Sequence, residues 1–439
     1  MLAMISIINY RSIKKLDKLK LGNFHVLTGP NASGKSTLLD AIYFVRDCLI
    51  KGPSESVASR VADYSDLTWN RNGKAVAIEL WFDFYVDEKP CEPPKKTEAN
   101  ENINRLDIKY KNNCILYSLS LEWKDGKIAS KELLTCYPKN IKKPEQFVEL
   151  SQRTISENDL LGSFENKKWF RREDGSGSTD YFNFQPAYLY LQYIPPDLTL
   201  YPTANKIKDL IINNFHLIKL DSGVMRRPYP AHSPISSMLA SDGANIASII
   251  WQLNNKVQRD GASGYDGCKR DRWIRLVQLA LPEILSVPPM KTEPNNAEYF
   301  KVDYHGFACP CWSLSEGTLR ILGLTLLPFL SGFESGSPRI IMVEEPENGV
   351  HPKGLEIIMI ALSSVSFAQV LVTTHSPSVV QYTGRDRLLC ISKDPEEGTL
   401  IQLGSDHPVL KRWDGYRSHA DPCEEEIDLA AIFASGILG

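Results

Sequence analysis

Short apolar runs of strand length dominate the first part of the chain, and each is bounded by polar or turn-forming residues. Within residues 75–86, apolar side chains recur at every second position, which is typical of a strand with one buried face. We expect a basic segment around Lys14–Lys20 to join the first two strands. The expected strands are Met4–Ile8, Asn23–Leu27, Ala75–Val86, Leu106–Tyr110 and Cys114–Trp123. The pattern predicts a group of antiparallel strands.

Between residues 204 and 285, apolar residues recur three and four positions apart, which is the period of a helix. Polar interruptions at 226–234 and 261–267 divide this stretch into several helices, and no heptad pattern is sustained. Strands and helices alternate again from residue 298. The chain is therefore expected to contain three parts: an N-terminal lobe over 1–200, a helical insertion over 201–297 and a C-terminal lobe over 298–439.

The segment Gly29–Thr37 (GPNASGKST) fits the spacing G-x-x-x-x-G-K-[ST] and lies between an expected strand and an expected helix. In this arrangement several backbone N–H groups and the positive end of the helix dipole face one point, which suits a phosphate. Lys35 would reach the β- and γ-phosphates, and the Ser36 hydroxyl would be a ligand of Mg²⁺. The alternative, a chance glycine-rich turn, is disfavoured by the flanking strand and helix. The expected nucleotide-binding residues are Asn31, Ala32, Ser33, Gly34, Lys35, Ser36 and Thr37.

Two adjacent carboxylates follow the apolar run 339–343, which is typical of a buried parallel strand. The carboxyl end of such a strand is where α/β sheets bind ligands. Glu344 would hold Mg²⁺, directly or through water, and Glu345 would orient the attacking water as a general base. The alternative is a strand end with solvated acids. His375 ends another β-rich run and could reach the γ-phosphate or its water, although a lone histidine is more often structural.

Ser315 and Gly317 lie at the start of another expected helix. Serine and glycine at a helix start can form a second anion-binding terminus, and the alternative is a simple N-cap. Because the loop around Lys35 already supplies one phosphate site, a second one in the same chain needs an explanation.

Composition narrows the classes of partner. The net charge is −3 and the pI about 6.3, so no global basic field indicates nucleic acid. Local basic clusters such as Lys269–Arg270 can be solvated surface or a nucleic-acid face. No apolar run approaches the roughly 18–20 residues of a membrane helix, and the first residues lack a signal-peptide pattern. With nine scattered cysteines, these features predict a cytoplasmic protein without membrane contact.

The order of the motifs resembles the head of ABC-type AAA family ATPases in the RecF, SMC and OLD-like branch, and is similar to ATPases of anti-phage defence systems. The resemblance implies an α/β fold, the ABC-type P-loop NTPase head, in which a mixed sheet carries an antiparallel β subdomain and a helical insertion. It also implies an ATPase with ATP and Mg²⁺ as cofactors. The matching segments are the P-loop Gly29–Thr37, the signature Leu314–Thr318, the Walker B strand Ile340–Glu345, the D-loop-like segment Pro346–Pro352 and the switch histidine His375.

In heads of this family, two copies pack head to tail and enclose two ATP molecules. The resemblance therefore implies that Ser315 and Gly317 contact the γ-phosphate held by Lys35 of the partner subunit. A homodimer or higher homo-oligomer is expected, which ATP closes and hydrolysis releases. Three positions bear on the family pattern: Glu344 replaces a common aspartate, Glu316 replaces the glycine of transporter signatures, and Gln192 is a candidate for the Q-loop glutamine.

One hypothesis of function and two alternatives follow. The residues after His375 are too few for the Toprim domain of OLD nucleases, so we expect a stand-alone head that acts with a separately encoded effector, a nuclease or a toxin. By resemblance, such a head is a sensor or regulator in prokaryotic anti-phage defence. The alternatives are a RecF-like clamp for DNA repair or recombination, and a nucleotide-cemented oligomeric scaffold with little turnover.

Overall fold

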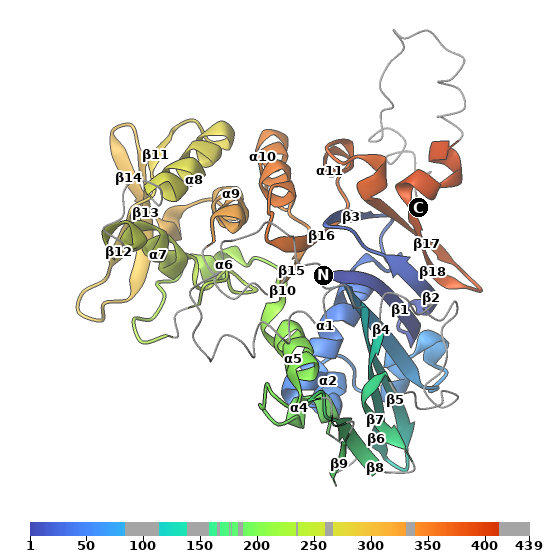
Figure 1. Ribbon diagram of the computed structural model, residues 1–439. Helices are drawn as coiled ribbons and strands as arrows, with labels where there is room; N and C mark the ends of the chain where they lie inside the picture. The colour runs from blue at the N-terminus through green and yellow to red at the C-terminus, as the bar shows by residue number, and fades with distance from the viewer. Residues whose placement is uncertain are drawn as a thin grey trace, which may run out of the picture. The chain divides into compact units, whose positions relative to one another are not determined.

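The computed structural model describes residues 1–83, 114–137, 158–164, 167–174, 176, 178–182, 188–233, 236–259, 267–330 and 339–411 (Figure 1). The chain divides into two compact units. The first unit contains residues 1–22, 32–215 and 392–401, and the second contains residues 23–31, 216–391 and those from 402 onward. Residues 201–297, the expected helical insertion, hold helices in both units together with short strands.

The first unit contains a run of antiparallel strands in the order β18-β2-β1-β4-β5-β6-β7-β8-β9. This confirms the antiparallel β subdomain expected from the sequence. The strands are β1 (Leu2–Tyr10), β2 (Ile13–Lys20), β4 (Val76–Asp83), β5 (Cys114–Lys124), β6 (Lys127–Tyr137), β7 (Asp159–Phe164), β8 (Lys167–Arg171), β9 (Thr179–Phe182) and β18 (Gly398–Leu403).

Two expectations about these strands were wrong. The basic segment Lys14–Lys20 is not a connection but most of β2, in which Ile13 and Leu16 are buried while Lys15 and Lys20 remain exposed. Strand β4 is buried on both faces rather than one, because its polar-face residues also lie inside the unit. The expected strand Leu106–Tyr110 lies outside the described residues.

Helix α1 (Lys35–Lys51) is the main helix of the first unit and starts within the P-loop motif. Its apolar side is buried, with Leu38, Leu39, Ile42 and Phe44 in the core. Around it lie α2 (Pro53–Ala58), α4 (Tyr190–Tyr193) and α5 (Pro202–Asn214).

The second unit contains the strand order β10-β15-β16-β3-β17, in which β15, β16, β3 and β17 run parallel to their neighbours. Their bounds are β3 (Phe24–Thr28), β10 (Phe215–Ile218), β15 (Arg339–Glu344), β16 (Ala368–Thr374) and β17 (Leu388–Asp394). A second, small antiparallel sheet consists of β11 (Ile284–Ser286), β12 (Pro289–Lys291), β13 (Glu298–Tyr304) and β14 (Phe307–Pro310).

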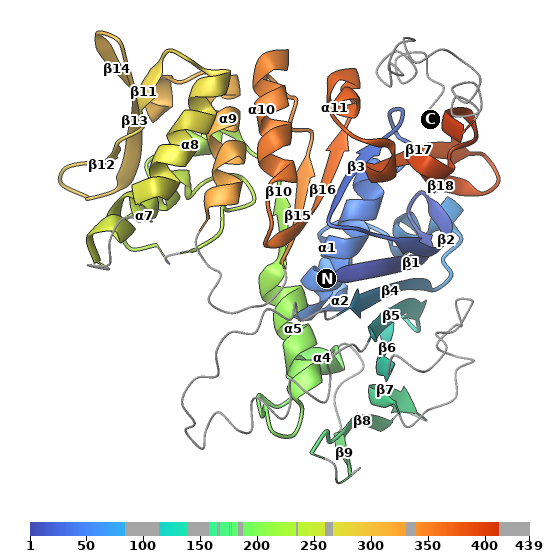
Figure 2. The same cartoon turned by 45° about the horizontal axis from the view of Figure 1, so that its top comes forward.

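Within its described residues, the second unit also contains the helices α6 (Ser222–Met225), α7 (Ile246–Arg259), α8 (Gly267–Ala280), α9 (Glu316–Leu326), α10 (Pro352–Ser363) and α11 (Pro377–Gln381). Figures 1 and 2 show α8, α9 and α10 side by side, and these helices share one continuous hydrophobic core with the parallel strands. In this core the indole of Trp273 donates to the hydroxyl of Thr325 over 3.2 Å. The helices within the described residues lack the combination of length and hydrophobicity that a membrane span requires.

Candidate functional site

The P-loop motif is shared between the two units, because the chain passes from the second unit to the first between Asn31 and Ala32. Strand β3 and the start of the loop therefore belong with the Walker B strand. The remainder of the loop and α1 belong with the antiparallel strands. Asn31, Ala32 and Ser36 are exposed, whereas Ser33, Gly34 and Lys35 are buried.

Gly34 meets two separate requirements for glycine. Its φ of +113° lies in the left-handed region, where side chains are strained. A Cβ at this position would also lie 2.3 Å from Oγ1 of Thr399 and 2.9 Å from Oγ of Ser12. Strand β18 thus approaches the loop so closely that only glycine fits.

Hydroxyl groups of Thr399, on β18, and of Ser12 hold the P-loop through a series of hydrogen bonds. Thr399 Oγ1 donates to the carbonyl of Ser33 over 2.8 Å and lies 2.9 Å from Oγ of Ser12. Ser12 in turn lies 3.1 Å from Oγ1 of Thr37. These contacts hold the loop at Ser33 and Thr37, whereas Ser36 between them remains exposed. Thr399 was not singled out from the sequence, because it is distant from the motif along the chain.

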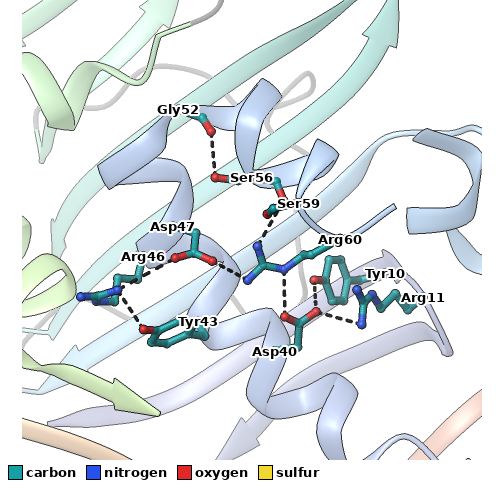
Figure 3. A network of polar contacts seen from close by, with 10 residues as sticks. All are labelled: Tyr10, Arg11, Asp40, Tyr43, Arg46, Asp47, Gly52, Ser56, Ser59 and Arg60. Carbon is teal, nitrogen blue, oxygen red and sulfur yellow. Dashed lines mark hydrogen bonds and ion pairs between the residues drawn. The ribbon is translucent and has the colours of Figure 1, made fainter. Parts of the chain in front are cut away.

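A polar network anchors α1 beyond the loop (Figure 3). Arg60 donates through Nε to Asp40 and through Nη2 to Asp47, both over 2.8 Å. Asp40 also accepts from the hydroxyl of Tyr10 at 2.6 Å and pairs with Arg11 at 3.2 Å. Burial, followed by the negative charge of Asp40, raises the pKa of Tyr10 well above its usual value. The helix that carries Lys35 is therefore tied to the end of β1 and to the segment after α2.

In the second unit, strand register brings the ends of β3, β16 and β15 to one edge. Thr28 pairs with Thr374, and Thr373 pairs with both Leu27 and Glu344. Because these strands are parallel, their carboxyl ends meet at this edge, as the α/β pattern requires. Glu344, Glu345 and His375 therefore lie at the edge where β3 enters the P-loop.

The two acids have different surroundings. Glu344 is 14% exposed, and its Oε2 lies 3.1 Å from Nζ of Lys219. Glu345 has a φ of +46°, and its N–H donates to the carbonyl of Thr373 over 3.0 Å. Asn348 Nδ2 donates to the Glu345 carboxylate at 2.7 Å, and Nε2 of His375 lies 3.9 Å from it.

Glu347 is a positioning residue that sequence reasoning missed. Its Oε1 accepts from the Thr374 hydroxyl at 2.9 Å and from the His375 N–H at 2.7 Å, which fixes the backbone at the switch histidine. The available signal was a third acid in the run Glu-Glu-Pro-Glu, but spacing alone does not show which of three carboxylates turns back toward β16.

The signature residues make contacts inside their own unit. Ser315 is the N-cap of α9: its Oγ accepts from the N–H of Thr318 over 3.1 Å. A Cβ on Gly317 would lie 2.4 Å from the carbonyl oxygen of Gly349, so the start of α9 packs against the D-loop-like segment. Within the described residues, neither Ser315 nor Gly317 is hydrogen-bonded to Glu344, Glu345 or His375.

Gln192, the Q-loop candidate, lies in α4, where its carbonyl accepts from Nζ of Lys208 at 2.6 Å.

The residues present suit a nucleotide with a divalent cation. The first turn of α1 contains no acidic residue, so the positive end of its dipole is not neutralised there. The hydroxyls of Thr28, Ser33 and Thr373 are buried and have no hydrogen-bond partner among the described residues. The Ser36 hydroxyl and the Glu344 carboxylate are oxygen donors of the kind that Mg²⁺ prefers.

Comparisons with known proteins identify a family and a fold. A family model described as "AAA domain, putative AbiEii toxin, Type IV TA system" matches residues 24–90 and 95–381. Among solved structures, the chain is similar to an SMC head bound to the C-winged helix domain of ScpA, with 12% sequence identity and a TM-score of 0.51 over 91% of this chain and 97% of that chain. It is also similar to an SMC head domain from Pyrococcus furiosus, which has an extended coiled coil and is bound to the C-terminal domain of ScpA. The identity is 12% and the TM-score 0.50, over 94% of this chain and 99% of that chain.

No curated protein matches the chain in sequence. At 12% identity the likeness to the solved structures shows the fold alone. That fold is the α/β fold of an SMC head P-loop NTPase, and it confirms the ABC-type head expected from the motif order.

Proposed function

The chain belongs to the AAA domain family whose model it matches, and on this basis we propose that it binds ATP with Mg²⁺ and hydrolyses it. Lys35 and the loop N–H groups hold the phosphates, and Ser36 and Glu344 hold the cation. The bound Mg²⁺ supplies positive charge at the phosphate oxygens. Glu345 accepts a proton from the attacking water, and His375 orients the γ-phosphate or this water.

One observation carries this proposal: Glu344, Glu345 and His375 meet at the strand edge where β3 enters the P-loop. The two acids are also differentiated, which supports separate roles. Glu344 continues the strand and faces a basic group, whereas Glu345 leaves the strand in a left-handed turn and is held by Asn348. A carboxylate fixed by one amide donor retains acceptor positions for a water proton.

The exposed start of α9 supports assembly of two copies. Ser315 and Glu316 are exposed at the N-terminus of an eleven-residue helix whose remaining length is largely buried. In a head-to-tail pair, Ser315 and Gly317 would face the γ-phosphate held by Lys35 of the partner subunit. Because this contact needs the γ-phosphate, ATP favours the closed pair and hydrolysis opens it.

The pair acts as a sensor or regulator of a separately encoded effector in prokaryotic defence. The family description, which names a type IV toxin–antitoxin system, supports this setting. The coupling follows from the packing of Gly317 on Gly349, because a shift at the signature helix reaches the segment that follows the Walker B acids.

The test compares two site variants with two matched controls. Lys35→Ala should abolish ATP binding, whereas Lys51→Ala, at the exposed other end of α1, should leave it unchanged. Glu345→Gln should lower kcat by about 100-fold or more and accumulate an ATP-bound dimer, because a general base contributes about 10²–10⁴ to the rate. Glu55→Gln, on the exposed side of α2, should behave as wild type.

Wild-type turnover equal to that of Glu345→Gln, with assembly intact, would contradict hydrolysis and favour a scaffold. ATPase activity stimulated by duplex DNA and lost at high salt would instead support a DNA clamp.

A further inference from the structure

Lys219 follows β10 directly, and its ammonium reaches the carboxylate at the end of the neighbouring strand β15. Nζ lies 3.1 Å from Oε2 of Glu344, and the strand order places β10 beside β15. The roles proposed above do not use this lysine. Its target, however, is the acid assigned to the divalent cation.

Hydrogen bonds hold the backbone around Lys219, whereas most of its side chain is exposed. The N–H of Lys219 donates to the carbonyl of Ser241 over 2.7 Å, and the N–H of Asp221 donates to the carbonyl of Asp242 over 3.0 Å. Leu220, between them, is buried. The Lys219 side chain is nevertheless 72% exposed. The lysine thus extends from a hydrogen-bonded backbone and pairs with Glu344 through a largely solvent-exposed side chain.

The negative charges at the end of β15 favour a bound cation, and either an ammonium or a metal ion can supply the positive charge. Glu344 and Glu345 are adjacent carboxylates, and Glu345 is already held by Asn348 and lies near His375. Among the described residues, Lys219 is the basic group paired with Glu344. An ammonium donates to the same carboxylate oxygens that ligate a magnesium ion. Both cations therefore have one acceptor group in common.

We propose that Lys219 is an internal counter-ion of Glu344 that competes with the divalent cation for this carboxylate. The inference rests on the proposed function in one respect, the assignment of Glu344 to the cation. Exposed ion pairs are weak, so an arriving metal–nucleotide complex can displace the lysine. Lys219 therefore neutralises Glu344 before loading and weakens the binding of the metal.

Lys219→Met, which keeps the length of the side chain and removes its charge, provides the test. Binding of Mn²⁺ at a fixed concentration of AMP-PNP is followed by the electron paramagnetic resonance signal of free Mn²⁺. The expected result is an apparent Mn²⁺ affinity about two- to fivefold tighter than wild type, the range of an exposed ion pair. Lys411→Met is the matched control, because Lys411 makes an exposed pair of similar length, 3.0 Å, with Asp406, outside the site. It should leave the affinity unchanged.

A second arm repeats the substitution in the Glu344→Gln background, where removal of Lys219 should no longer change the Mn²⁺ affinity. Thermal melting of each variant confirms that the chain is folded. An unchanged affinity in Lys219→Met, with normal binding by wild type, overturns the competition. A weaker affinity also overturns it, and would mean that the lysine contacts the phosphates. A wild-type chain that binds no Mn²⁺ with AMP-PNP contradicts the proposed function and this inference together.

Discussion

Replacing Arg60 by methionine is expected to loosen helix α1, because this arginine joins two acids of the helix to the segment after α2 (Figure 3). Arg60 is 9% exposed, and its Nε and Nη2 donate to Asp40 and Asp47 at 2.8 Å each. Methionine retains most of the apolar length of the side chain. The substitution therefore removes the charge and both hydrogen bonds without leaving a large cavity.

The two acids respond differently to this loss. Asp40 keeps the Tyr10 hydroxyl at 2.6 Å and Arg11 at 3.2 Å, so its charge stays compensated. Asp47, only 10% exposed, keeps Arg46 at 3.9 Å. Each charge-assisted hydrogen bond contributes about 1.5–3 kcal/mol, and breaking a buried pair costs about 3–5 kcal/mol. With Asp40 largely compensated, we expect a loss of about 3–4 kcal/mol, mostly at Asp47.

Amide hydrogen exchange of peptides from α1 measures this loss locally. Since about 1.4 kcal/mol corresponds to a factor of ten, protection should fall by about 150- to 800-fold. Arg71→Met is the matched control: Arg71 pairs with Asp66 over the same 2.8 Å, but the arginine is 70% exposed, so little change is expected.

Adding Asp47→Asn to Arg60→Met removes the unpaired charge and should restore part of the protection. A fall of less than about fivefold in Arg60→Met, or an equal fall in Arg71→Met, would refute the reasoning, because burial would then not govern the strength of these pairs.

Three further predictions concern single positions. Gly317→Ala places a Cβ 2.4 Å from the carbonyl oxygen of Gly349, and it should lower ATPase activity by about tenfold or more and reduce the melting temperature. Gly323→Ala, on the same helix, is the control: its Cβ meets only flexible side chains at 3.1–3.2 Å, and the substitution should be tolerated. Glu347→Ala removes the acceptor of two hydrogen bonds and should lower kcat more than ATP affinity; an unchanged kcat would show that the switch histidine is held by other contacts. Burial lowers the pKa of His25, so the contribution of the neutral imidazole to stability is complete above pH 6.5 and is lost as the pH falls below that value. His25→Gln should reduce this acid sensitivity in melting curves, and identical pH profiles of variant and wild type would contradict a role of His25 in it.

The P-loop and the Walker B strand could be predicted from local pattern. The helix begins at Lys35, inside the motif, and β15 ends at Glu344, the residue after which the apolar run stops. Both boundaries are set by neighbouring residues: glycine permits the left-handed entry to α1, and the change from apolar to charged residues ends a buried strand.

Charge periodicity misled the interpretation of Lys14–Lys20. Its lysines obscure the apolar residues Ile13 and Leu16, which are buried when the segment pairs with β1. For β4, alternation predicted one exposed face, but the strand is covered on both, because neighbouring segments that the local pattern cannot reveal pack over it.

The sequence by itself predicted candidate residues for phosphate and metal and determined the strand ends at which they lie, because these properties depend on residue type and on neighbours a few positions away. Only the tertiary structure decided which groups touch them: Thr399 behind Gly34, Lys219 on Glu344 and Glu347 under His375. Each of these contacts joins residues distant along the chain. Such contacts are set by strand order and register, which bring a side chain into contact with a partner that no local spacing identifies.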